Sequence, residues 1–247
     1  MGKFFYFILC GVIFSIVLNI LYFSKKHITT GETKVFSILL LVNLISLLNE
    51  LACSYIGYSF YENSLLSHVV TKTYLICLMT FLLYMTLYIY VICYVDNKNN
   101  NKKHYRTLKV ISYFIWFVCI LIVIILPITT GRGYAVGLAV NWLYICSTVV
   151  MTEWFIPFIK NFKYIDKKKI SPIILFVIFM SIIAFIQKAY PDVTIVTVME
   201  FLIIFIMYHT IENPDMKMLN EMTLARNQAE KANRAKSDFL SSMSHEI

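Results

Sequence analysis

The stretch Leu66–Val95 reads LSHVVTKTYLICLMTFLLYMTLYIYVICYV, and its length and apolar character decide the class of fold. A transmembrane α-helix needs about 20 predominantly apolar residues to cross a hydrocarbon core about 30 Å thick. This stretch exceeds that length and contains a single lysine, Lys72. It therefore predicts a helix that spans a membrane.

Six other runs have the same character and are long enough, or nearly so, to span a bilayer. They lie at about Phe4–Ser24, Val35–Gly57, Val110–Thr129, Tyr134–Ile159, Pro172–Lys188 and Val193–Thr210. Hydrophobic residues make up 59% of the chain and charged residues only 15%, which is outside the range of ordinary soluble domains. The sequence therefore predicts an all-α integral membrane protein whose residues 1–210 form a bundle of seven transmembrane helices.

The lysines and arginines of the connections predict the orientation of the bundle. The second, fourth and sixth connections offer only Arg132 and Lys188, whereas the first, third and fifth are rich in basic residues: Lys25, Lys26, Lys34, Lys98, Lys102, Lys103, Arg106, Lys109, Lys160, Lys163, Lys167, Lys168 and Lys169. Basic loops stay in the cytoplasm. We therefore expect the N-terminus outside and the chain after Thr210 in the cytoplasm.

The basic residues and the cysteines exclude several other classes of function. The formal net charge is +8, but the basic residues lie in short loops between apolar runs, which favours contact with anionic lipid headgroups over nucleic acid. All six cysteines lie inside apolar runs and none forms a C-x-x-C pair. This placement predicts buried free thiols, with neither a disulfide framework nor a metal site.

Four polar residues map to the outer half of the predicted spans: Glu50, Lys72, Asn141 and Glu200. Ionisable groups inside a membrane are costly and usually face the interior of a bundle. We expect Lys72 to pair with Glu50 or with Glu200. Such a pair either is purely structural or lines a polar signal pocket, and the sequence leaves both readings open. Glu153 lies near the cytoplasmic end of its span, where it either snorkels or pairs with a loop lysine.

The chain beyond the last span predicts a long cytoplasmic helix. Asn213 is placed to cap a helix whose first position is Pro214, and Asp215 suits the positive end of its dipole. We divide this part into a linker, residues 211–234, that either transmits motion or is passive, and a terminal segment, residues 235–247. Heptad a and d positions fall on Met222, Ala225, Ala229, Ala232, Lys236, Phe239, Met243 and Glu246, which predicts a coiled coil.

Leu240 and Ile247 occupy heptad position e and widen the apolar face to one suited to a dimeric four-helix bundle. His245 falls at position c, away from that face. Phe239, Leu240, Met243, Ser244, His245, Glu246 and Ile247 closely resemble the motif F-L-x-x-M-S-H-E-[IL] of the phosphoacceptor helix of bacterial sensor histidine kinases. The chain ends before the Arg-Thr-Pro that usually follows, so we expect it to be the front part of a longer protein.

The resemblance implies a function in two-component signal transduction. His245 would be autophosphorylated with ATP, Glu246 would be the general base, and the phosphoryl group would pass to an aspartate of a response-regulator receiver domain. ATP and Mg would be bound by a further domain, because the chain has no Gly-rich phosphate-binding motif beyond the turn Gly131-Arg132-Gly133. The resemblance also implies a homodimer in the bacterial cytoplasmic membrane. The outer connections are short, so we expect the signal to meet the helices, the bilayer or a small partner within it.

Two other classes of protein fit parts of this pattern. A small transporter or channel with a coiled-coil tail would show inverted repeats or paired broken spans, and the sequence shows neither. A non-enzymatic receptor that oligomerises through its tail has no need of Ser244-His245-Glu246. A histidine kinase sensor accounts for both the spans and the tail.

Overall fold

The structure is a computed structural model that describes residues 4–25, 28, 30–59, 64–95, 101–131, 134–165 and 167–245. It confirms an all-α fold. The helices are α1 Phe5–Ser24, α2 Gly31–Ser59, α3 Leu65–Tyr94, α4 Lys102–Ile125, α5 Leu138–Glu153, α6 Phe155–Asn161, α7 Lys167–Ala189, α8 Val196–Met207 and α9 Pro214–His245, with a short 3-10 turn at Phe162–Tyr164 and a π-helical turn η2 at Tyr208–Glu212.

Within these described ranges, seven helical segments are long and apolar enough to cross a membrane, with α5 and α6 together forming the fifth and the last continuing into α9. Each of the seven predicted runs falls on one of these segments. The fifth run begins differently from the prediction, because Ala135–Val136 forms strand β2, which pairs antiparallel with strand β1, Thr129–Thr130. Gly137 then turns the chain into α5 with a φ of 128°, a conformation that favours glycine.

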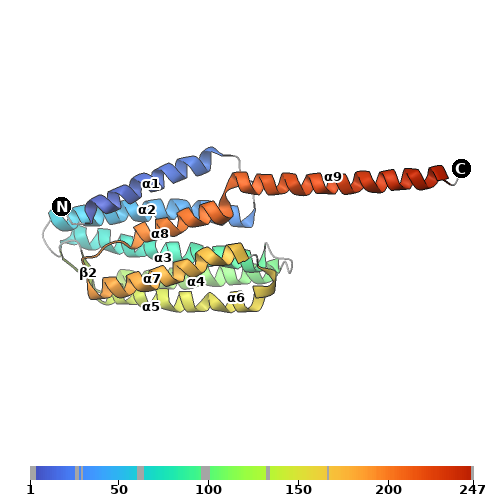
Figure 1. Cartoon of the computed structure of the whole chain (residues 1–247). Helices are drawn as coiled ribbons and strands as arrows, with labels where there is room; N and C mark the ends of the chain where they lie inside the picture. Colours follow the sequence, from blue (N-terminus) through green and yellow to red (C-terminus); the bar gives the residue numbers. More distant parts are fainter. Residues whose placement is uncertain are drawn as a thin grey trace.

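The bundle has two distinct ends, which we name the hairpin end, where β1 and β2 lie, and the α9 end, from which α9 leaves (Figure 1). Successive spans run in opposite directions, so the starts of α2, α4 and α7 lie at the α9 end. α9 comprises 32 residues and extends beyond the bundle as a single rod of about 48 Å. Its last residue, His245, therefore lies far from the bundle.

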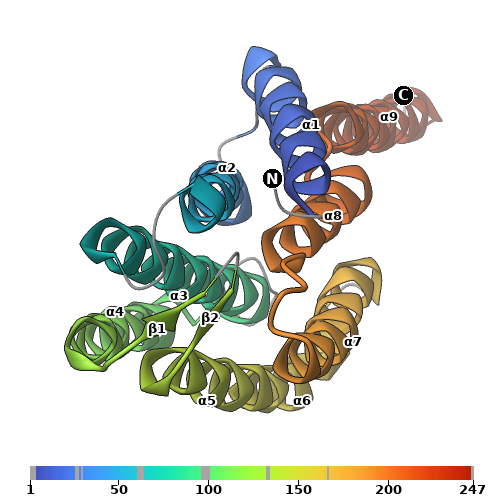
Figure 2. The same ribbon diagram turned by 90° about the vertical axis from the view of Figure 1, so that its left-hand side faces the viewer.

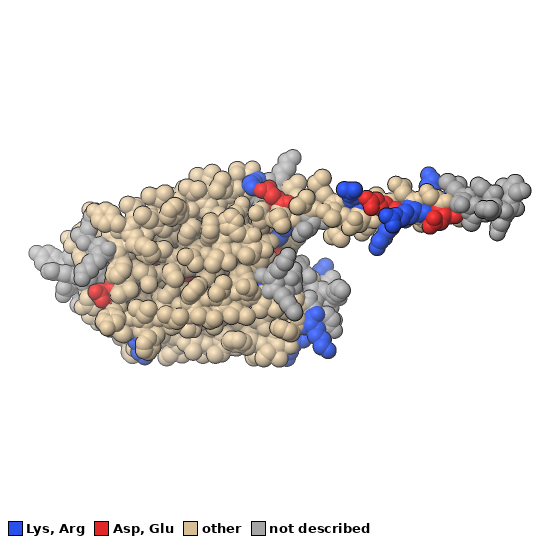
Figure 3. Space-filling model, viewed as in Figure 1, with Lys and Arg blue, Asp and Glu red and all other residues tan. Residues whose placement is uncertain are grey.

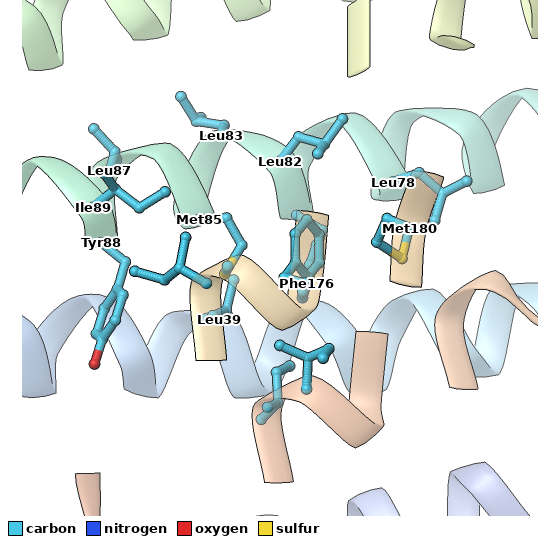
Figure 4. Close-up of a cluster of buried hydrophobic side chains, with 14 of the residues drawn as sticks. Leu39, Leu78, Leu82, Leu83, Met85, Leu87, Tyr88, Ile89, Phe176 and Met180 are labelled. Atoms are coloured by element: carbon cyan, nitrogen blue, oxygen red, sulfur yellow. The ribbon is translucent and has the colours of Figure 1, made fainter. Parts of the chain in front are cut away.

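α3 is the central helix of the bundle. In the 18-residue stretch of α3 that is apolar enough to cross a membrane, 78% of the residues are buried, whereas only 6% are buried in the corresponding stretch of α4. α2 and α4 pack on α3, while α1 packs on α2 and α7 on α8. Figure 4 shows Phe176 and Met180 of α7 facing Leu78, Leu82 and Met85 of α3.

The outer surface of the bundle is apolar. Large side chains such as Phe14, Ile115 and Phe185 are exposed on α1, α4 and α7. In the space-filling view the flank of the bundle is almost free of charge, and the charged side chains lie near its ends and along α9 (Figure 3). Such a large apolar surface is expected of a protein surrounded by lipid. The seven apolar helices thus indicate a multi-pass membrane protein.

The start of α9 confirms the predicted cap. The side-chain Oδ1 of Asn213 accepts a hydrogen bond from the backbone N–H of Asp215 at 3.1 Å. Pro214 is the first residue of α9, where its missing N–H costs nothing. Between α8 and α9 the backbone widens into the π-helical turn η2. π-Helical turns are rare and often lie at functional sites.

Candidate functional site

A cavity of about 440 Å³ lies in the half of the bundle toward the hairpin end. Its wall comes from α2, α3, α5, α7 and α8, and residues of the hairpin, including Thr130 and Ala135, contribute to it. Figure 2 looks from the hairpin end and shows these five helices arranged around a common centre. The volume falls in the range of about 300–1,000 Å³ that is typical of sites for small molecules.

Two carboxylates, Glu50 of α2 and Glu200 of α8, line the cavity and are each only 2% exposed. The hydroxyl of Thr197 donates a hydrogen bond to Oε2 of Glu50. The backbone carbonyl of the same threonine accepts a hydrogen bond from Nδ2 of Asn43 at 3.2 Å. Thr197 therefore ties α8 to α2 beside the cavity.

Three further oxygens of this group are buried and form no hydrogen bond of good geometry among the described residues: Oε1 of Glu50, Oε2 of Glu200 and the hydroxyl of Tyr74. Tyr74 lies close enough to Glu50, and Asn43 close enough to Glu200, for each pair to interact. Glu50 and Glu200 are close enough for their charges to interact. A buried polar group without a partner costs about 1–3 kcal/mol, and more when it is charged. The arrangement therefore favours a ligand that donates hydrogen bonds.

The other two predicted pocket residues lie elsewhere. Nζ of Lys72 donates to the backbone carbonyl of Ile124 in α4 at 2.5 Å, so the expected ion pair with Glu50 or Glu200 is not formed within the described structure. Asn141 is exposed on α5 and is not among the residues that line the cavity. Both corrections have the same cause. Lys72 and Asn141 directly follow the cavity residues Thr71 and Val140, and one residue turns a helix by about 100°.

A layer of aromatic side chains lies below the cavity, toward the α9 end. The rings of Phe81 and Phe176 stack with centroids 6.0 Å apart, and Trp154 lies 5.6 Å from Phe176. The indole N–H of Trp154 donates to the hydroxyl of Thr86 at 3.0 Å. Rigid contacts of this kind connect α3, α7 and the α5–α6 corner. The carboxylate of Glu153 accepts a hydrogen bond from the hydroxyl of Tyr90, and no ion pair of Glu153 with a lysine is formed among the described side chains.

A second polar cluster lies at the α9 end, where the bundle meets α9. Glu212 in η2 is 1% exposed, and its Oε1 accepts from the hydroxyl of Tyr88 at 2.8 Å. Its Oε2 accepts from Nζ of Lys217 in α9 at 2.6 Å. The buried charge of Glu212 is therefore compensated by a charge on α9 itself.

Lys217 also reaches α2, where its Nζ donates to the hydroxyl of Thr33 at 3.2 Å and lies 3.9 Å from Oε2 of Glu32. Glu32 pairs in addition with Lys169 of α7. We call this cluster the junction, and its members are Lys25, Glu32, Thr33, Tyr88, Lys169, Glu212, Asp215 and Lys217. The junction joins α9 to α1, α2, α3 and α7.

The outermost contact of the junction is the ion pair between Lys25, which follows α1, and Asp215 of α9. The hydrogen bond to Asp215 raises the pKa of the Lys25 ammonium above its ordinary value. Both side chains are largely exposed, so solvent screening makes the pair weak. The buried contacts of Glu212 and Lys217 therefore dominate the junction.

The predicted phosphoacceptor segment is described only in part. His245 is the last residue of α9, and Glu246 lies outside the described residues. The heptad residues Met222, Ala225, Ala229, Ala232, Lys236 and Phe239 all lie on exposed positions of α9 in this single chain. Leu219 and Met222 are exposed by 57% and 69% respectively. This apolar surface on an isolated helix favours association with a second copy.

Sequence reasoning missed the junction and part of the cavity. Glu32, Tyr88, Glu212 and Lys217 come from four separate elements, and no local motif links them. One signal was available, because Glu32 and Glu212 are acidic residues within a basic end of the bundle. Tyr74 and Thr197 gave no comparable signal, since both are common in apolar helices.

Comparison of the chain with protein-family models, curated proteins and solved structures found no match.

Proposed function

We propose that the chain is the sensor part of a two-component histidine kinase. A signal received by the seven-helix bundle controls the autophosphorylation of His245 and the transfer of the phosphoryl group to an aspartate of a response-regulator receiver domain. The observation that carries this proposal is the seven-residue resemblance at Phe239–Ile247, at the far end of the helix that the junction ties to the bundle.

The chemistry of the proposed reaction suits this segment. A neutral imidazole is a good nucleophile near neutral pH, and it attacks the γ-phosphorus of ATP with ADP as the leaving group. The carboxylate of Glu246 accepts the imidazole proton as general base. ATP and Mg are supplied by a separate nucleotide-binding domain, which the family resemblance places after Ile247.

The proposed location is the bacterial cytoplasmic membrane, with the hairpin end outside and the α9 end in the cytoplasm. Its support is the distribution of basic residues. Lys25, Lys34, Lys102, Lys103, Arg106, Lys160, Lys163 and Lys169 belong to the starts and ends of helices that meet at the α9 end. Basic segments remain in the cytoplasm, which is also where ATP is available to His245.

The proposed route of the signal runs along α3 and α8. α3 contributes Tyr74 to the cavity and Tyr88 to the junction. α8 contributes Glu200 to the cavity and leads through η2 to Glu212. A shift of α8 against α2 and α3 would change the position of Glu212, and the ion pair with Lys217 would transmit that change to α9.

Phosphorylation with labelled ATP tests the proposal. Membranes that contain the full-length gene product are incubated with labelled ATP, and wild type is compared with His245→Gln. We expect an acid-labile, base-stable label in wild type, because phosphohistidine is formed, and loss of that label in the variant. His104→Gln on α4 is the matched control and should keep the label. Label that survives His245→Gln would overturn the proposal.

A further inference from the structure

The walls of the cavity define what can occupy it. Apolar side chains form most of one side, among them Leu75, Leu78 and Leu82 of α3 and Val177 and Met180 of α7. Hydroxyl groups of Ser147, Thr148 and Ser181 lie among the other lining residues. The volume of about 440 Å³ accommodates an organic molecule and is much larger than a bare ion requires. An occupant must therefore have an apolar body.

The charged side chains of the cavity indicate which polar head group the occupant has. Its described lining residues include Glu50 and Glu200 but no Lys, Arg or His. Two buried carboxylates without a cation are costly to keep ionised, and one positive charge between them removes most of that cost. Lys72, which directly follows the lining residue Thr71, contacts α4 instead.

The unpartnered oxygens match one particular head group. Oε1 of Glu50, Oε2 of Glu200 and the hydroxyl of Tyr74 are buried and form no hydrogen bond of good geometry among the described atoms, and Tyr74 lies beside Glu50. A primary ammonium group has three N–H donors and one positive charge. We propose that the cavity binds a monocationic amphiphile, with its primary ammonium group held by Glu50, Glu200 and Tyr74 and its apolar body against α3 and α7.

That the amphiphile is the signal rests on the proposed function. That the cavity binds the amphiphile does not, because binding can be measured without a kinase. The 247-residue chain is placed in nanodiscs of zwitterionic lipid, and saturable binding of labelled decylamine is measured near neutral pH. Decanol and decanoate, which have the same apolar body, are the competitors. We expect unlabelled decylamine to compete and the other two to compete poorly.

The carboxylate variants provide the decisive comparison. In the double variant Glu50→Gln, Glu200→Gln we expect affinity to fall by about thirtyfold or more, the effect of removing a buried charge partner. Glu153→Gln, a carboxylate outside the cavity, should bind as wild type does. If the double variant does not fold, Glu200→Gln alone serves, because the contact between Thr197 and Glu50 remains. Ala184→Leu, which fills part of the cavity and keeps both carboxylates, should also weaken binding.

Equal affinity of wild type and the carboxylate variants, or equal competition by decanol, would overturn the assignment. Either result would mean that the two carboxylates do not hold the head group and that the cavity takes an apolar chain without regard to charge. This failure is distinct from a failure of the proposed function, which is decided by the label on His245 and not by decylamine.

Discussion

At the scale of single residues, Lys217 is the group on which the junction depends. Its ammonium is within 3.9 Å of two buried carboxylates, those of Glu32 and Glu212, and it donates to the hydroxyl of Thr33. The side chain is 19% exposed, whereas that of Glu212 is fully buried. Removing one partner of such a pair leaves the other charged and unsolvated.

We therefore expect Lys217→Ala to lower the free energy of unfolding by about 3 kcal/mol, which is characteristic of a broken buried ion pair. Unfolding in mixed micelles, followed by circular dichroism, measures this change. The matched control is Arg226→Ala, which breaks the exposed pair between Arg226 and Glu230 one turn apart on α9. That variant should change stability by no more than about 0.5 kcal/mol. Equal effects of the two substitutions would show that the junction does not hold α9.

At the scale of elements, α9 is the helix whose stability is not explained by the single chain. It is 32 residues long, and its heptad positions from Met222 to Phe239 are exposed. Most of the stability of a helix comes from packing of an apolar face and not from intrinsic propensity. The small residues Ala225, Ala229 and Ala232 at a and d positions allow two helices to approach closely. A second copy of α9 would cover this stripe.

A dimer formed through this stripe, which we propose, predicts a pattern of cross-linking along α9. Ala225→Cys places a thiol on the heptad seam, and we expect rapid formation of a disulfide-linked dimer in membranes under mild oxidation. Asn227→Cys, two residues further on, places the thiol away from the seam and should cross-link at least about tenfold more slowly, because the Cα atoms of a disulfide lie within about 7 Å. Non-reducing electrophoresis distinguishes the two variants. Equal rates at both positions would contradict a heptad dimer.

At the scale of the whole molecule, the protein has a cavity toward one end, an aromatic layer below it and a charged junction at the other end. The aromatic layer includes Phe81, Trp154 and Phe176, all of them buried. α3 and α8 extend past the cavity and the aromatic layer to the junction. Tyr74 and Tyr88 of α3 are separated by about 21 Å along the helix, so a rigid helix reaches from the cavity to the junction. This layout suits the relay between two sites that we propose.

The sequence predicted where the helices lie along the chain much better than which side of each helix faces the cavity. The seven runs and the cap at Asn213 follow from local composition, and the structure confirms them. Lys72 and Asn141 directly follow the lining residues Thr71 and Val140 but are not themselves among the lining residues, because the direction of a side chain follows from packing between helices and not from its position along a helix. The partners of Lys217 could not be predicted, since Glu32 lies 185 residues before it in the chain.

We propose that the bundle controls His245 through a rigid helix, and changing the length of α9 tests this most directly. One alanine inserted after Arg226 turns the following segment by about 100° relative to the junction, whereas seven inserted residues restore its direction within about 20°.

The measurement is the rate of phosphoryl label incorporation at His245 in membranes that contain the full-length gene product. We predict a change of about tenfold or more for the one-residue insertion, in the range of ordinary coupling energies, and a rate near that of wild type for the seven-residue insertion. Equal rates in wild type and both insertion variants would contradict the account and would make α9 a passive linker.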